Sequence, residues 1–162
     1  MLNYAKQHPE IEWIFKPHPL LRLGIQRSGF MSDAEIDKYY QEWESIASHC
    51  YDSDYQDLFL DSRAMITDCG SFLSEYGATG RPVIRLISSV NIRKPIAKLN
   101  ELYESYYQVH DLEELRMTLE LVVENGQDPA REKRLSALEK TGLGSVDASA
   151  NIVAHLKEVF KR

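Results

Sequence analysis

Two short polar segments of the sequence hold residue types that bind phosphate groups. The first is Lys16-Pro17-His18-Pro19, which directly follows the apolar run 11–15. An ammonium and an imidazole in this position can both donate hydrogen bonds to a diphosphate, and the flanking prolines hold the backbone in a fixed extended turn. The alternative is a loop histidine beside a solvated lysine, and the segment alone leaves both interpretations open.

The second segment, Thr67-Asp68-Cys69-Gly70-Ser71, lies between a predicted strand and a predicted helix. Unpaired backbone N–H groups and the positive end of the helix dipole would face the same point there. This arrangement suits a phosphate, with the hydroxyls of Thr67 and Ser71 as further donors. The alternative is an ordinary helix cap, which the turn alone favours because Ser and Asp are common at helix starts without any ligand.

Three acidic residues, Asp54, Asp57 and Asp61, cluster before the second segment. Carboxylates in such places bind ribose hydroxyls or simply cap and solvate a short helix. For Asp57 the solvated helix is the preferred interpretation. Asp54 stays a candidate for the nucleotide.

Other kinds of site lack their characteristic motifs. The sequence contains no GxGxxG, GxxxxGK[ST], GxSxG or HExxH pattern, which argues against dinucleotide, P-loop, serine hydrolase and zinc protease sites. Cys50 and Cys69 have no CxxC spacing, so neither a zinc site nor a disulfide framework is indicated. We therefore expect reduced thiols, no bound metal and no cofactor.

The elements that must position these residues alternate between strands and helices. A capping box at Ser32 and Glu35 predicts the helix start at residue 33. Strands are predicted at 11–15, 46–51, 64–67, 83–87 and 106–109, and helices at 2–7, 33–43, around 58–59, 72–76, 112–124, 129–140 and 148–160. We predict an irregular segment over 88–105.

This alternation predicts an α/β fold with a doubly wound, Rossmann-like parallel sheet and a helical C-terminus. Ligands of such sheets bind outside the carboxyl ends of the strands, where both polar segments fall. The length of 162 residues suits one domain over 1–162. A doubly wound domain normally opens with a strand, so we expect a domain that is entered partway.

The charge and composition of the chain limit the kinds of partner that it can bind. The net charge is −6, from 25 acidic and 19 basic residues, and no basic block would follow a phosphate backbone, so nucleic acid is not an expected partner. The start has no basic stretch leading into an apolar run, and no window has the length of a bilayer span. We therefore expect a cytoplasmic protein.

The order and separation of three motifs resemble one family. They are FKPHP at 15–19, DYQDLFLDSRAMITDCGSFLSEY at 54–76 and RPVI at 81–84. Together they look like the carboxy-terminal domain of the CDP-glycerol glycerophosphotransferases of teichoic acid and capsular polysaccharide synthesis. The likeness is best over residues 1–88, and residues 146–149 loosely match the family's step before its last helix.

The resemblance implies the second half of a GT-B architecture, which holds a nucleotide-linked donor such as CDP-glycerol. The acceptor and catalytic base would come mainly from an amino-terminal domain that is absent here. His18 is then the catalytic electrophilic clamp, and the residues that hold the donor diphosphate are Lys16, His18, Thr67, Gly70 and Ser71. The nucleotide would be contacted by Asp54, Asp68 and Glu75. Peripheral association of the intact enzyme with the inner face of the plasma membrane is also a family expectation.

Two departures from the family pattern keep other functions open. The turn at 67–71 reads Thr-Asp-Cys-Gly-Ser where the family usually has Thr-Asp-Tyr-Ser-Ser, and a convincing copy of the family's arginine-bearing loop is missing from 88–107. No donor role is therefore assigned to Arg85 or Arg93. The alternatives are a nucleotide-sugar glycosyltransferase donor domain and a non-catalytic α/β interaction module.

Overall fold

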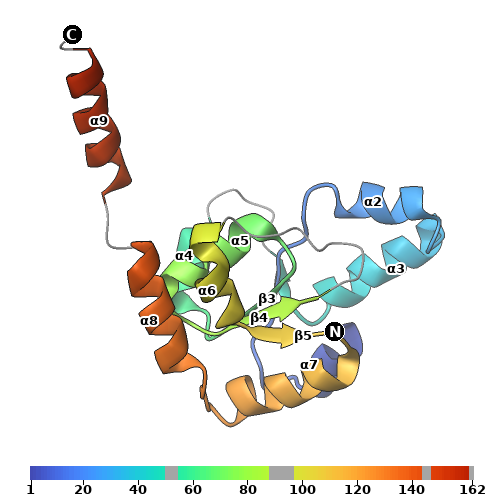
Figure 1. Cartoon of the computed structure of the whole chain (residues 1–162). Coiled ribbons are helices and arrows are strands. Elements are labelled where there is room, and N and C mark those ends of the chain that lie inside the picture. Colours follow the sequence, from blue (N-terminus) through green and yellow to red (C-terminus); the bar gives the residue numbers. More distant parts are fainter. Residues whose placement is uncertain (50–54, 88–96, 144–146, 161–162) are drawn as a thin grey trace. The chain divides into compact units, whose positions relative to one another are not determined.

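In the computed structural model the chain divides into two compact units, Met1–Leu58 and Phe59–Arg162 (Figure 1). The structure describes residues 1–49, 55–87, 97–143 and 147–160. The single domain predicted over 1–162 stays a prediction.

The first unit is mostly helical around one short parallel strand pair. Its elements are α1 (Leu2–Gln7), β1 (Ile14–Phe15), α2 (Leu21–Ser28), α3 (Asp33–Glu44) and β2 (Ser48–His49). Strand β1 pairs in parallel with β2 in the register Ile14↔Ser48. Helix α2 was not predicted, although Leu21 and Ile25 stand at helical spacing; the helix buries none of its residues.

Helix α3 begins and packs as its sequence indicates. The Ser32 hydroxyl accepts the Glu35 N–H and the Glu35 carboxylate accepts the Ser32 N–H, so the predicted capping box is confirmed. The Phe15 ring stacks on Trp43 with 4.8 Å between ring centres, and Ile36 is buried. Strand β1 is therefore held against α3, and this contact fixes the point where the Lys16–Pro19 segment starts.

The second unit contains a three-stranded parallel sheet in the order β3-β4-β5. Its strands are β3 (Met65–Thr67), β4 (Val83–Leu86) and β5 (Tyr107–Val109), and its helical elements are α4 (Gln56–Asp61, which begins in the first unit), α5 (Gly70–Glu75), η1 (Gly77–Thr79), η2 (Ala97–Leu99), α6 (Asn100–Glu104), α7 (Leu112–Leu119), the π-helical turn η3 (Glu120–Glu124), α8 (Arg131–Thr141) and α9 (Ala148–Val159). The fold is therefore mixed α/β with parallel strands.

One stretch differs from the sequence prediction. We expected residues 88–105 to be irregular, but η2 and α6 occupy 97–104, and residues 88–96 lie outside the described residues. Leu102 and Tyr103 are buried in α6. Their burial stabilises this helix of five residues, which is too short to be predicted from helix propensity alone.

Helices α5 and α6 lie side by side over the sheet (Figure 1). The Tyr106 hydroxyl donates to the Leu73 carbonyl at 2.7 Å, and burial raises the pKa of this hydroxyl. A Cβ atom on Gly77 would lie 2.0 Å from the same hydroxyl, so only glycine fits there. The core beneath includes Leu73, Val83, Ile84, Leu102 and Leu119.

The C-terminal helix α9 begins after its N-cap Asp147, whose carboxylate accepts the Ala150 N–H at 2.9 Å. Its large apolar side chains are exposed: Ile152, Val153, Leu156, Val159 and, just after the helix, Phe160. None of the helices in the described part of the chain combines the length and apolar character needed to cross a membrane.

A buried ion pair ties α8 to the sheet. Arg134 has 0% exposure, pairs with Asp128 through two of its nitrogens and donates from Nε to the Gly80 carbonyl at 2.9 Å. The Tyr107 hydroxyl of β5 donates to the same Asp128 carboxylate at 2.8 Å. Burial acts to raise the pKa of Asp128, but the hydrogen bonds from Arg134 and Tyr107 outweigh it and lower the pKa below its ordinary value.

We expect Asp128→Asn to lower the free energy of unfolding by about 2–3 kcal/mol at neutral pH, because it leaves the Arg134 charge buried without its partner. Since the folded-state pKa of Asp128 is lowered, its stabilising effect is complete above the unfolded-state pKa of about 3.9 and is lost as the pH falls through the folded-state value. Urea unfolding of wild type and variant at pH 7 and pH 3 should therefore show a difference that shrinks at pH 3.

The matched control is Glu132→Gln, which removes an exposed carboxylate from the same helix. We expect it to change stability by less than about 0.5 kcal/mol at either pH. An Asp128→Asn penalty of equal size at pH 7 and pH 3 would contradict the role given to the ion pair.

Candidate functional site

The turn at the carboxyl end of β3 holds most of the predicted phosphate-binding residues in one place. Thr67 ends the strand and is half-buried, whereas Asp68, Gly70 and Ser71 are exposed. The Thr67 hydroxyl oxygen accepts the Cys69 N–H at 3.0 Å, which folds the chain back at the strand end. The Cys69 sulfur lies 3.3 Å from the Ser71 hydroxyl.

Helix α5 begins without the side-chain cap that the turn alone favours. Its N-cap is Cys69, in extended conformation and with no side-chain cap hydrogen bond. In the part of the chain that the structure describes, no acceptor faces the backbone N–H of Gly70 or of Ser71. Among the described residues, a Cβ atom built on Gly70 meets no atom within 4 Å.

Tyr103 of α6 forms hydrogen bonds to the turn and to α5. The Tyr103 hydroxyl donates to the Gly70 carbonyl at 3.2 Å and lies 2.7 Å from the Ser74 hydroxyl. The Arg85 guanidinium lies over the Tyr103 ring, 5.6 Å from its centre. Arg85 is also the partner of Thr67 in the β3–β4 register. Paired positions of adjacent strands point to the same face, so Arg85, Thr67 and Tyr103 share one face of the sheet.

The Lys16–Pro19 segment lies in the first unit, directly after β1. Lys16 is half-buried, with its ammonium 4.6 Å from the centre of the Tyr55 ring. His18 is exposed, and its Nδ1 lies 3.1 Å from the Leu20 N–H, which donates to it. Because Nδ1 acts as the acceptor, the neutral ring carries its proton on Nε2, and that N–H faces outward as a donor.

The remaining predicted residues are Glu75, Asp54, Asp57 and Asp61. Glu75 ends α5 and is exposed, about 7.5 Å along the helix axis from Gly70. Asp54 lies outside the described residues, whereas Asp57 and Asp61 are exposed in α4. Among the described residues, no group of three or more His, Cys, Asp or Glu side chains could hold a metal ion.

Sequence reasoning left Arg85 and Tyr103 without a role, although the structure places both next to the turn. A signal for Arg85 is present in the sequence. It is the charged residue in the run Val83-Ile84-Arg85-Leu86, which otherwise reads as a buried strand. Tyr103 has no such signal, because it lies in a stretch that we predicted to be irregular.

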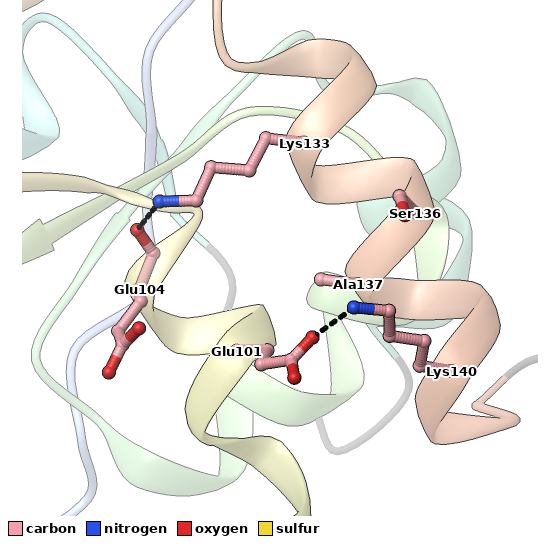
Figure 2. A pocket seen from close by; sticks show the side chains of 6 residues that line it. All are labelled: Glu101, Glu104, Lys133, Ser136, Ala137 and Lys140. Carbon is pink, nitrogen blue, oxygen red and sulfur yellow. Dashed lines mark hydrogen bonds and ion pairs between the residues drawn. The ribbon is translucent and has the colours of Figure 1, made fainter.

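A hollow of about 270 Å³ lies between α6 and α8 and shares no residue with this turn (Figure 2). Lys140 Nζ is 2.6 Å from Glu101 Oε2, and Lys133 Nζ donates to the Glu104 carbonyl at 3.1 Å. Its remaining lining comes from Ser136 and Ala137. Lys140 and Lys133 thus both bind acceptors within the lining of this hollow.

We expect the neutral form of His18 to be the Nε2–H tautomer, because Nδ1 accepts the Leu20 N–H. Long-range ¹H–¹⁵N NMR spectra at pH above 8 should show an unprotonated Nδ1 and a protonated Nε2 for His18. The exposed His155 of α9 is the internal reference, for which we expect averaged tautomers. An Nδ1–H signal for His18 would contradict the observed hydrogen bond.

Comparisons with known proteins do not place this chain in a family. No family model, curated protein or solved structure matches it. The resemblance seen in the motifs at 15–19, 54–76 and 81–84 therefore stays a prediction that rests on the residues themselves.

Proposed function

We propose that this chain is the donor-binding half of a glycerophosphotransferase-like enzyme, which transfers glycerol phosphate from CDP-glycerol or a similar donor to a cell-envelope polymer. The proposal includes a Rossmann-like, doubly wound domain of GT-B type. A second domain would supply the acceptor site and the base, so we expect donor binding without turnover by this chain.

The observation that carries the proposal is the parallel sheet of the second unit. Strands β3, β4 and β5 run in parallel, and β3 leads directly into exposed polar residues at its carboxyl end. Ligands of parallel α/β sheets bind at this edge because loops and helix starts converge there. The uncapped start of α5 at Gly70 and the adjacent Ser71 hydroxyl supply neutral donors, which suit phosphate oxygens.

The proposal also gives a role to two donors of the first unit, the Lys16 ammonium and the His18 imidazole. Lys16 and the outward Nε2–H of His18 follow β1 within three residues, and the Leu20 N–H holds the imidazole in the donor tautomer. In the proposed reaction an acceptor hydroxyl attacks the donor phosphorus, the new P–O bond forms and the bond to CMP breaks. His18 would donate a hydrogen bond to the phosphate oxygens as negative charge develops, without taking the acceptor proton.

Asp68 and Glu75 remain proposed contacts to the nucleoside, together with Asp54. The proposal places the intact enzyme in the cytoplasm, at the inner face of the plasma membrane, where a growing envelope polymer would be available. Its ligand would be the nucleotide-linked donor rather than nucleic acid.

Two other functions have a specific observation in their favour. A nucleotide-sugar donor is favoured by Cys69 and Gly70. These residues are smaller than the Tyr-Ser pair that the glycerophosphotransferase family usually has there, so the turn can differ in shape and in the donor it accepts. An interaction module is favoured by the exposed apolar side chains of α9, among them Ile152 and Phe160. Only the first of these alternatives requires nucleotide binding.

Calorimetric titration with CDP, CDP-glycerol and a UDP-sugar tests the proposal. We expect the wild-type chain to bind the cytidine compounds, and the His18→Ala, Ser71→Ala double variant to bind them at least tenfold more weakly, because donors to charged oxygens contribute about 1.5–3 kcal/mol each. The matched control is His155→Ala, Ser149→Ala, which removes an exposed histidine and an exposed serine from α9.

The ligand that binds decides between the alternatives. Preference for the UDP-sugar would favour the glycosyltransferase donor domain. A folded wild-type chain that binds none of the three compounds would contradict the proposal for this chain.

Gly70→Ala tests whether a ligand approaches the α5 backbone. The added methyl group meets no atom of the described residues within 4 Å, so we expect the free energy of unfolding to change by less than about 1 kcal/mol. A phosphate held on the backbone N–H groups would meet that methyl, and we expect donor affinity to fall about tenfold. Gly24→Ala in α2, which also meets nothing within 4 Å, is the control. Equal affinities for the two variants would contradict backbone binding.

A further inference from the structure

Arg85 is a cation in an otherwise apolar strand. It follows the buried Val83 and Ile84 in β4 and is itself half-buried. Its guanidinium lies over the Tyr103 ring, and no described carboxylate forms an ion pair with it. Arg134 in the same unit shows the usual arrangement, because that buried guanidinium is paired with Asp128. A guanidinium withdrawn from water is normally stabilised by an anion.

The position of Arg85 relates it to the turn after β3. Thr67 is its partner across the β3–β4 register, so the two side chains leave the sheet on the same face. Tyr103 links them, because its ring centre lies 5.6 Å from the Arg85 guanidinium and its hydroxyl donates to the Gly70 carbonyl at 3.2 Å. The guanidinium therefore lies next to the turn and against a ring face, a contact that uses no hydrogen-bond acceptor, and a guanidinium carries its N–H groups in its own plane.

We propose that Arg85 is an anion-binding residue that contacts the phosphate oxygens of the ligand at the carboxyl end of β3. The inference rests on the proposed function and extends it by one residue. Thr67, Gly70 and Ser71 supply only neutral donors at this turn, and Arg85 adds a fixed positive charge with planar, paired donors. Such a fork matches two oxygens of one phosphate group.

Inorganic pyrophosphate is the probe, because it carries the anionic chemistry without a nucleoside. We expect calorimetry at low ionic strength to show that Arg85→Met weakens pyrophosphate binding at least tenfold. The dependence of affinity on salt should also become shallower, because one charge fewer faces the anion. The control is Arg63→Met, an exposed arginine before β3, for which we expect affinity within about twofold of wild type.

A second measurement, by NMR, uses the wild-type chain with Arg85 in place. It therefore tests the proposal even if Arg85→Met fails to fold. The Nε–H resonance of Arg85, assigned by its absence in Arg85→Lys, should shift when pyrophosphate is added to the wild-type chain. A purely packing role would leave both this resonance and the salt dependence unchanged.

The outcomes separate this inference from the proposed function. Cytidine binding that is unaffected in a folded Arg85→Met chain overturns the role of Arg85 and leaves the donor-binding proposal standing. Pyrophosphate binding that depends on Arg85, without any nucleotide binding, supports the anion contact and overturns the nucleotide donor. A wild-type chain that binds neither compound overturns both.

Discussion

The arrangement of the second unit depends on one buried guanidinium. Arg134 is withdrawn from water on α8, so each of its N–H groups must find an acceptor within the protein. Its acceptors are the Asp128 carboxylate and the Gly80 carbonyl, and the Tyr107 hydroxyl of β5 donates to the same Asp128 oxygen that accepts Arg134 Nη1. Groups from a helix, a loop, a turn and a strand therefore meet at one charge, and loss of Asp128 would leave that charge buried without its partner.

The contact between Arg134 and Gly80 lies just before β4, the strand that carries Arg85. Gly80 stands at φ +70°, and a Cβ atom there would lie 2.8 Å from Leu135 of α8, so the turn before β4 is seated closely on that helix. Strand β4 begins three residues later and brings Arg85 beside Thr67. The position of Arg85 therefore depends on packing before the first residue of β4. The residues that pack there, Gly80 and Leu135, are not among the proposed ligand contacts. Tyr103 and Tyr106 then fix α5 over the sheet from α6.

Local chemistry made part of this structure predictable. Ser32 and Glu35 predict the start of α3, because a capping box is encoded within four residues. The apolar runs before Thr67 and after Pro82 predict β3 and β4. Helix α6 and the role of Tyr103 were not predictable, because they depend on burial against residues some 30 positions away. At the start of α5 the sequence left two interpretations open, and the side-chain cap that the turn alone favours does not form, because Ser and Asp are local cap signals that the fold does not use there.

An acidic chain with a proposed anionic ligand also needs a physical account. The net charge of −6 is spread over the chain, and at physiological ionic strength exposed charges are screened within about 8 Å. Arg85 is half-buried, where screening by salt is weaker, and Tyr103 holds it by its ring face instead of by a carboxylate that would cancel its charge. The turn after β3 also holds the exposed Asp68 carboxylate, and the positive groups there are this cation and the first N–H groups of α5. Neither depends on the sign of the distant surface.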